Sequence, residues 1–395
     1  MSYMGRDPGT LWPLTAYPGS RNYGEVDVGS WSARPVLSVV AERVLPIPLT
    51  TTLTRAGRLR RLHGLTRPAL AAYELPKARL TLYSDLDDIV YRVSVPPRPG
   101  HPLTEQYVLR LHATTSIAAI ESELLWLRDL CEQTDLGVPA PQLTRDGALV
   151  TTVGGDRERR PYPCSLRQWM PGRRLSRGLT PARLTQVGAF MAALHLHAAA
   201  YQPPPGFVRP PWDWERFFGA SSMLNPAVAR DRVSPSDLAV FTAFAAHLRN
   251  VFALIGTGRD SIGLIHSDLQ QSNYLFYKGQ VQAIDFTDCG VGPYLFDMAV
   301  CISEAEDPEG DGHVSSSALR AAFLDGYTRA RPLPSFYPQH ISTFLGLRLV
   351  DLVNWALSWP TLTARPWGPR FIPYAANSLR RYLLSEESAA TDSRD

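Results

Sequence analysis

Cysteine is scarce in this sequence, and long apolar runs are absent from it. Cys131, Cys164, Cys289 and Cys301 form no CxxC pair, so neither a zinc site nor a disulfide framework is indicated. No apolar run approaches the roughly 18 residues that span a bilayer, and the first residues lack the charged and apolar blocks of a signal peptide. We therefore expect a cytoplasmic protein with reduced thiols and no membrane partner.

A large excess of one charge is absent as well. The 395 residues carry a net charge of +3, and the Lys and Arg residues are spread along the chain, so nucleic acid is not an expected partner. The chain is longer than the about 250–300 residues that one hydrophobic core supports. We expect two packed lobes, and nothing in the sequence indicates an oligomeric state.

The first part of the chain predicts a short extension and then a small sheet. Residues 1–42 are rich in Gly, Pro and Ser without a regular period, which is typical of a poorly ordered extension. Residues 43–167 contain three β-branched and aromatic runs separated by turn-rich stretches, a pattern that predicts antiparallel strands. Ser116 then opens an amphipathic segment. These features indicate a small antiparallel sheet with one long helix packed on it.

The second part of the chain is mainly helical. Residues 168–385 contain long stretches with apolar residues at helical spacing, and residues 386–395 predict a frayed tail. One strand pair interrupts the helices, because YLFYKGQVQAID alternates apolar and polar residues around Lys278 and Gly279. The fold class is therefore α+β, with a helical second lobe.

That hairpin brings metal-binding residue types together. Counting outward from Lys278 and Gly279 places Asn273 beside Ile284 and Asp285 on the partner strand. Carboxylate and amide oxygens suit Mg²⁺, which takes one or two protein ligands and completes its octahedron with phosphates and water. The sequence therefore predicts a metal-phosphate site at the open end of the hairpin.

A third polar group precedes the hairpin. Asp268 lies five residues before Asn273 in GLIHSDLQQSN, on the loop that enters the same end. A carboxylate separate from the metal ligands is what phosphoryl transfer to a hydroxyl requires, since it orients the attacking oxygen and takes its proton. We expect Asp268 to be this base and His266 to hold the loop.

A resemblance to a known family rests on two segments, HSDLQQSN and AIDFTDCG. Together they resemble the HxDxxxxN and Asp-Phe pair of the aminoglycoside phosphotransferase superfamily, which includes choline kinases and type II homoserine kinases. The resemblance implies a bilobal protein-kinase-like fold that uses ATP and Mg²⁺. It also implies that Asp268 is the catalytic base, that Asn273 and Asp285 bind Mg²⁺, and that His266 supports the loop.

Further blocks follow in the order of that family. YVLRLHA looks like the strand with the phosphate-contacting cation, here Arg110, and IESELLWLRDL looks like the helix whose carboxylate pairs with it, here Glu123. RQWMPG resembles the hinge that binds adenine through its backbone, which implies Gln168, Trp169 and Met170 as nucleotide contacts.

The chain departs from the family pattern in two places. Gln270, Gln271 and Ser272 replace the His-Pro-Gly of many relatives. The first hairpin has no glycine, and Asp87 and Asp88 stand where a phosphate-facing turn is expected, where two anions would repel a triphosphate.

The expected function is transfer of the ATP γ-phosphoryl group to a hydroxyl of a small molecule, such as an aminoglycoside, an amino alcohol or a homoserine-like compound. The acidic run SEAEDPEGDG would suit a cationic acceptor. Asp288 is a further metal-ligand candidate, although a turn-capping role fits it equally. Two alternatives remain open: a Ser/Thr protein kinase of the same superfamily, and a nucleotide-binding pseudokinase scaffold.

Overall fold

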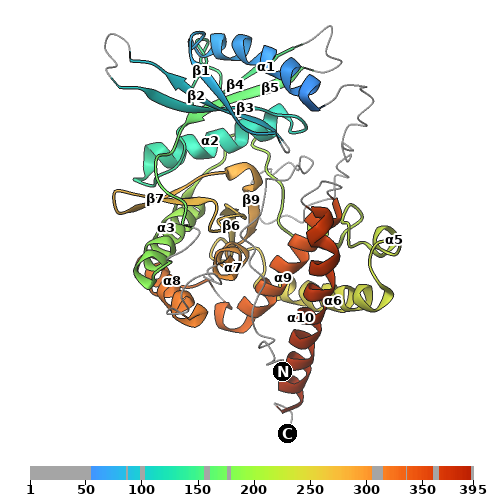
Figure 1. Cartoon of the computed structure of the whole chain (residues 1–395). Coiled ribbons are helices and arrows are strands. Elements are labelled where there is room, and N and C mark those ends of the chain that lie inside the picture. Colours follow the sequence, from blue (N-terminus) through green and yellow to red (C-terminus); the bar gives the residue numbers. More distant parts are fainter. Residues whose placement is uncertain are drawn as a thin grey trace, which may run out of the picture.

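A computed structural model describes most of the chain. The described residues are 55–85, 88–97, 103–154, 161–175, 179–304, 315–334, 336–358 and 364–392. The predicted extension over residues 1–42 and the side chain of Asp87 lie outside this set. Two lobes stack on one another, with the small sheet above the helical lobe in Figure 1.

The small lobe contains a five-stranded antiparallel sheet, as the alternating runs predicted. Its strand order is β1-β2-β3-β5-β4, so β5 lies between β3 and β4. The strands are β1 (Arg79–Ser84), β2 (Ile89–Val95), β3 (Glu105–Leu111), β4 (Val150–Val153) and β5 (Tyr162–Gln168).

Two helices flank this sheet. Helix α1 (Arg55–Ala72) packs Leu62, Ala69 and Leu70 against sheet residues in a small core of its own. Helix α2 (Ile117–Gln133) lies on the opposite side of the sheet, next to the lower lobe (Figure 1). The Ser116 side chain caps α2 by accepting a hydrogen bond from the Ala119 N–H.

The apolar side of α2 belongs to the core of the large lobe. Trp126 is fully buried, and its ring packs edge-on against Phe286 at a centroid distance of 5.6 Å. The Trp126 indole N–H also faces His197 of the large lobe at 3.3 Å. The other α2 members of the large core are Ile120, Leu124, Leu127 and Leu130. Helix α2 therefore joins the two lobes physically.

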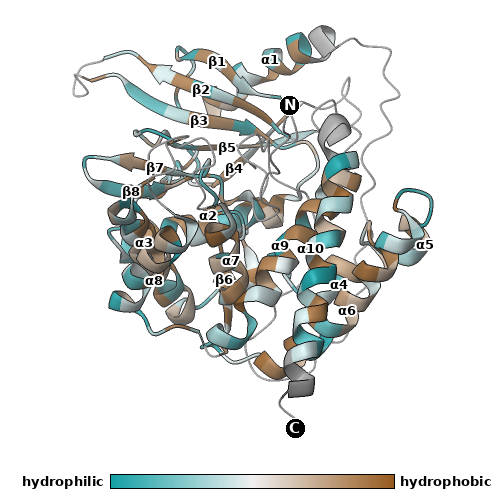
Figure 2. Cartoon of the chain, turned by 60° about the horizontal axis from the view of Figure 1, so that its bottom comes forward, coloured by the Kyte–Doolittle hydropathy of each residue, from teal (hydrophilic) through white to brown (hydrophobic). Residues whose placement is uncertain are grey.

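The large lobe is mainly helical, and its helices carry both hydrophobic and hydrophilic stretches (Figure 2). Its helices are α3 (Pro181–Ala200), α4 (Trp214–Phe218), α5 (Pro226–Ala229), α6 (Pro235–Ile255), α7 (Tyr294–Glu304), α8 (Ser316–Ala330), α9 (Tyr337–Ser358) and α10 (Ala364–Asp392). Two short strand pairs complete it: β6 (Ile262–Ile265) with β9 (Gly290–Pro293), and β7 (Tyr274–Tyr277) with β8 (Gln280–Ala283). Helix α10 continues to residue 392, past the start of the predicted frayed tail at residue 386.

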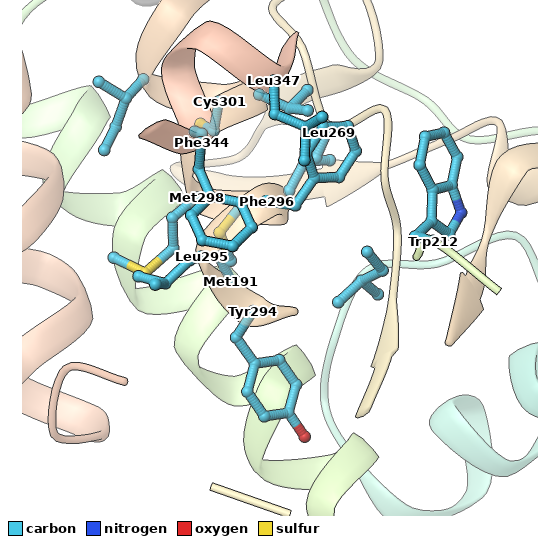
Figure 3. Packing of buried hydrophobic residues seen from close by; sticks show 14 of the residues in the cluster. Met191, Trp212, Leu269, Tyr294, Leu295, Phe296, Met298, Cys301, Phe344 and Leu347 are labelled. Atoms are coloured by element: carbon cyan, nitrogen blue, oxygen red, sulfur yellow. The ribbon is translucent and has the colours of Figure 1, made fainter. Parts of the chain in front are cut away.

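The core of this lobe is centred on α7. Figure 3 shows its side chains gathered with those of α9 and of the loop before β7. The labelled members from these three segments are Tyr294, Leu295, Phe296, Met298, Cys301, Phe344, Leu347 and Leu269. Leu269 of this core is the residue after Asp268, so the core supports the loop of the candidate site.

Helices α3 and α8 approach each other very closely. A Cβ added at Gly188 would lie 1.9 Å from the Phe323 carbonyl oxygen, and one at Gly326 would lie 1.9 Å from the Thr185 carbonyl oxygen. Only glycine leaves room for two backbones at this distance.

Helix α6 corrects one expectation from the sequence. Among the described helices it alone is long and apolar enough to cross a membrane by length and composition, although no such segment was expected. Core helices of globular proteins pass the same test, and α6 buries Phe241, Phe244 and Leu248 in the large core.

Candidate active site

The β7-β8 hairpin has the predicted register. Lys278 and Gly279 form its two-residue turn, with positive φ angles of 48° and 80° that suit a type I′ turn. The Ile284 N–H donates to the Asn273 carbonyl at 2.9 Å. Asn273 therefore lies directly beside the segment that carries Asp285, as the count from the turn predicted.

Asp268 and Asn273 are in direct contact. The Asn273 side-chain amide donates to the Asp268 carboxylate Oδ2 at 2.7 Å and to the Asp268 carbonyl at 2.9 Å. The Gln270 amide donates to the same Oδ2 at 3.2 Å, and the Gln271 amide donates to the Leu175 carbonyl. The loop is therefore held by its own polar side chains.

A residue that sequence reasoning missed holds the other oxygen of Asp268. Arg348 of α9 donates to Asp268 Oδ1 at 3.1 Å and to Asp351 Oδ2 at 2.9 Å. Burial raises the pKa of Asp268 well above its usual range; Arg348 opposes this, and nearby carboxylates, first Asp288, add to it. A charged pair three residues apart in the apolar run LGLRLVDLV was the one signal for Arg348.

Asp297 of α7 anchors the backbone that precedes Asp268. Its carboxylate accepts hydrogen bonds from the N–H groups of His266 at 3.0 Å and Ser267 at 2.7 Å, and it lies 3.1 Å from His195 Nε2. Ser267 has a positive φ of 66°, a strained conformation for a residue other than glycine. The two bonds to Asp297 stabilise this strained turn.

His266 connects the loop to the hairpin. Its Nε2 lies 3.0 Å from the Ile284 carbonyl, and its Nδ1 faces the Asp268 N–H at 3.3 Å. Burial lowers the pKa of His266, so the ring is neutral at pH 7. His266 therefore has the contacts of a residue that positions the loop, and its ring does not reach the Asp268 carboxylate through any hydrogen bond recorded among the described residues.

Asp285 pairs with Arg110 of strand β3. The Arg110 guanidinium lies 3.0 Å from Asp285 Oδ1 and also contacts the Thr287 hydroxyl, which itself donates to Oδ1 at 2.9 Å. Burial alone would raise the pKa of Asp285, but Arg110 and Thr287 outweigh it and lower the pKa. Asp285 keeps 26% of its side chain exposed and has a positive φ of 63°. It is thus an ionised carboxylate at an accessible, strained position.

The predicted ion pair between Arg110 and Glu123 is not the one formed. Glu123 of α2 is hydrogen-bonded to Arg167 of β5 instead. Burial opposes ionisation of Glu123, but Arg167, then Arg209 and Arg110, lower its pKa. The prediction missed Arg167 because this arginine lies on β5, the strand paired with β3, and it reaches the same helix. Arg110 is consequently directed to Asp285.

Asp88 has a role that the sequence did not predict. Its carboxylate accepts from the Ala113 N–H at 3.0 Å and lies 3.2 Å from His112 Nδ1 and 3.8 Å from Arg110 Nη1. Burial opposes its ionisation, yet His112 and Arg110 lower the pKa of Asp88 to about 2. Asp88 is therefore neutralised by cationic and polar neighbours, so the predicted repulsion of a triphosphate does not apply to it.

The hinge residues lie at the end of strand β5, where Gln168 is the last strand residue. The Gln168 N–H donates to the Ala140 carbonyl at 2.8 Å and the Trp169 N–H donates to the Gln106 carbonyl at 3.0 Å. These two donors are occupied, so Met170 is the hinge residue whose N–H remains for a ligand within the described part of the chain. The Trp169 ring packs under the Arg92 guanidinium at 4.6 Å.

The oxygen atoms of Asn273 and Asp285 suit a metal ion whose other ligands are phosphate oxygens and water. The Asn273 side-chain N–H₂ is directed to Asp268, so its Oδ1 is the atom left for a cation, beside the ionised Asp285. Buried Asp288 is close enough to raise the pKa of Asp268. Within the described residues no group of three or more His, Cys, Asp or Glu is arranged to hold a metal by itself. Asn273 and Asp285 would supply the one or two protein ligands that Mg²⁺ takes when phosphates and water complete its coordination.

Comparison with known proteins agrees with this geometry. Residues 82–333 match the phosphotransferase enzyme family, which is more than half of the chain. The protein belongs to that family. It is accordingly a kinase-type phosphotransferase with an alcohol group as acceptor.

Two curated relatives of this phosphotransferase cover most of its length. It is 24% identical over 292 residues to an amicoumacin kinase of Bacillus subtilis (strain 168), covering 71% of this chain and 80% of the relative. It is 26% identical over 245 residues to a homoserine kinase of Ralstonia pickettii (strain 12J), covering 60% and 68%.

Solved structures share the fold of this phosphotransferase. The microcompartment-associated aminopropanol kinase is 28% identical, with a TM-score of 0.66 over 82% of this chain and 98% of that chain. An amicoumacin kinase in complex with AMP-PNP, Ca²⁺ and Ami is 19% identical, with a TM-score of 0.62 over 80% and 96%. The predicted α+β bilobal fold is confirmed.

Proposed function

We propose that this phosphotransferase moves the γ-phosphoryl group of ATP to a hydroxyl of a small amine-bearing alcohol. The observation that carries the proposal is the arrangement of Asp268, Asn273 and Asp285: the Asn273 amide donates to Asp268 at 2.7 Å, and the Asn273 carbonyl accepts from the N–H of Ile284, the residue before Asp285. The proposal includes a cytoplasmic location, which the four free cysteines support.

Each side chain has a distinct role in this proposal. Asp268 orients the acceptor hydroxyl and takes its proton as the oxygen bonds to phosphorus and the bond to the ADP oxygen breaks. Asn273 and Asp285, with Asp288 nearby, hold Mg²⁺, which when bound neutralises phosphate charge. Arg110 binds phosphate oxygens.

The nucleotide base belongs at the hinge in this proposal. Its edge hydrogen-bonds the backbone of Gln168 and Met170, while Trp169 packs beside it. Glu123 holds Arg167 and thereby the end of β5 that leads into this hinge. Most of the rate enhancement then comes from positioning and electrostatics.

The charge around Asp268 favours a cationic acceptor. Asp285, Asp288 and Asp351 each act electrostatically on Asp268, while two guanidinium groups lie among these four carboxylates: Arg348 bonds Asp268 and Asp351, and Arg110 bonds Asp285. An excess of buried carboxylates attracts a ligand ammonium group and disfavours an anion. Amino alcohols such as aminopropanol and homoserine, the acceptors named for similar proteins, are therefore the first to test.

Thermal unfolding with ATP and Mg²⁺, separately and together, tests the nucleotide site. A rise in Tm that needs both components and is lost in Asp285→Ala supports the site, since about 3 kcal/mol of stabilisation is expected at 100 times Kd. No rise at millimolar nucleotide in the wild type would overturn the proposal and favour a scaffold protein.

A coupled ADP-release assay then tests the acceptor class. Each amino alcohol is compared with a neutral alcohol of the same size, and the amine is expected to give the higher kcat/KM. Faster turnover with the neutral alcohol would contradict the cationic acceptor, and turnover on a Ser- or Thr-containing peptide alone would favour the protein-kinase alternative.

A further inference from the structure

The loop between α3 and α4 crosses from the small lobe to the segment that follows Asp285. We call residues 207–212 of this loop the strap. The strap N–H of Val208 donates to the Ser122 hydroxyl of α2 at 2.8 Å. At its other end, the Trp212 N–H donates to the Val291 carbonyl at 2.7 Å and the Val291 N–H donates to the Pro210 carbonyl at 3.1 Å.

The strap also binds three consecutive carbonyl groups of the turn after Asp285. Arg209 donates through Nη2 to the Thr287 carbonyl and through Nε to the Cys289 carbonyl, the latter at 2.6 Å. The Trp212 indole N–H donates to the Asp288 carbonyl at 3.0 Å. The backbone of the turn is thus fixed from the strap side at every residue from 287 to 289.

The same guanidinium reaches the small lobe. Arg209 Nη1 donates to the Ala119 carbonyl at 3.0 Å, in the first turn of α2. Helix α2 carries Glu123, and the positive charge of Arg209 helps to lower the pKa of the Glu123 carboxyl. Arg209 is almost fully buried, so its three contacts are rigid and are protected from water.

Two glycines allow the strap to approach this closely. A Cβ at Gly290 would lie 2.3 Å from the Pro210 carbonyl oxygen and 2.7 Å from the Trp212 ring. A Cβ at Gly292 would lie 2.6 Å from Trp212 Cβ. The GVG sequence after Asp285 is therefore explained by contact with the strap.

We propose that Arg209 is a positioning residue that fixes the turn carrying Asp285 and Asp288 relative to helix α2. The inference rests on the proposed function, because its consequence is a defined place for the metal-bound nucleotide between the two lobes. Helix α2 and the turn after Asp285 are thereby coupled through one side chain. Side chains that orient ligands in this way typically change metal affinity or activity by about 10–100-fold when they are replaced.

The test compares Arg209→Met with Arg209→Lys, Trp212→Phe and Arg249→Met. Arg249 lies over the Trp214 ring at 3.8 Å and is exposed, so its variant controls for loss of an arginine. Trp212→Phe keeps the aromatic ring but removes the donor to Asp288, and remains available if Arg209→Met fails to fold.

Hydrogen-deuterium exchange of residues 286–291 is measured first, in protein without nucleotide or metal. Arg209→Met is expected to exchange faster there and in the first turn of α2, with a smaller increase in Trp212→Phe and none in Arg249→Met. The Mg²⁺ concentration for half-maximal stabilisation by ATP is expected to rise about 10-fold or more in Arg209→Met, and Arg209→Lys should recover part of it.

Two outcomes separate the inference from the proposed function. The role of Arg209 would be overturned if Arg209→Met exchanged hydrogen at the wild-type rate and needed the same Mg²⁺ concentration as the wild type for stabilisation by ATP. No Mg²⁺-dependent stabilisation in the wild type would overturn the proposed function instead, while faster exchange at residues 286–291 would still support the coupling by Arg209.

Discussion

At the scale of single residues, Asp268 combines burial with three hydrogen bonds to its carboxylate. Only 7% of it is exposed, and Arg348, Asn273 and Gln270 occupy both carboxylate oxygens. A base held in this way has one orientation, which suits alignment of an acceptor hydroxyl.

Replacing this carboxylate tests its role directly. Asp268→Asn should lower kcat by about 10²–10⁴-fold, because general-base catalysis contributes about that much. The variant should still fold because the amide keeps the shape of the side chain, but its Tm should be lower than that of the wild type, since the amide N–H₂ cannot accept the hydrogen bonds that reach one of the two Asp268 oxygens. An unchanged kcat in a steady-state assay would refute the assignment.

Asp88 predicts a pH dependence of stability. Its pKa is lowered from 3.8 to about 2 in the folded state, so its stabilising effect is complete above pH 4 and is lost as the pH falls to about 2. One pKa unit is about 1.4 kcal/mol, which gives about 2 kcal/mol at pH 7.

The corresponding variant is Asp88→Asn, measured by urea unfolding between pH 7 and pH 2.5. It should be about 2 kcal/mol less stable than the wild type at pH 7, and the two curves should converge toward the acid end. A difference that stays constant across this range would show that the ionisation of Asp88 is not its cause.

At the scale of secondary-structure elements, the contact between α3 and α8 depends on glycine. Alanine at Gly188 gains about 1 kcal/mol of helix propensity, but its Cβ would meet a backbone oxygen that no rotamer change can move. Overpacking of this kind costs typically about 1–3 kcal/mol and sometimes more, so Gly188→Ala should be less stable than the wild type.

Gly64 offers a matched control, because it lies in helix α1 and a Cβ there would have no neighbour within 4 Å. Gly64→Ala should raise the free energy of unfolding by up to about 1 kcal/mol. Equal effects of the two variants in chemical denaturation would contradict the close approach of α3 and α8.

Local elements of the fold were predictable from the sequence, and contacts between distant elements were not. The β7-β8 hairpin and its register follow from Lys278, Gly279 and the alternation around them, all within a dozen residues. Arg348 lies 80 residues from Asp268, and nothing in either segment indicates the other.

The site was predictable to the same extent. Asp268, Asn273 and Asp285 share one loop and hairpin, so spacing alone brought them together. Glu123 could pair with Arg110 of β3 or with Arg167 of β5. Which of them it meets depends on the order of the strands in the sheet, which the local sequence does not indicate. Arg209 lies in a loop without a regular pattern, where spacing carries no information about contacts.

At the scale of the whole molecule, helix α2 connects the two lobes, and we therefore expect them to unfold as one cooperative unit. Trp126 is buried in the core of the large lobe although α2 flanks the small sheet. Trp126→Ala should lower the free energy of unfolding by about 3–5 kcal/mol and should weaken both lobes together.

Differential scanning calorimetry checks this expectation. A single transition that moves to lower temperature in Trp126→Ala is the expected result, because loss of the shared core affects both lobes. Two separate transitions in the wild type, with only one of them shifted in the variant, would contradict a shared core.

The position of α2 also constrains how proteins of this shape diversify. Strand β5 ends at Gln168, where the chain leaves the small sheet, so this is the simplest point at which to join the lobes of two relatives. A crossover there would inherit α2 from one parent and the partners of its Trp126, His197 of α3 and Phe286 of the Asp285 turn, from the other. Chimeras joined there would carry a mismatched interior, so we expect them to be less stable than either parent.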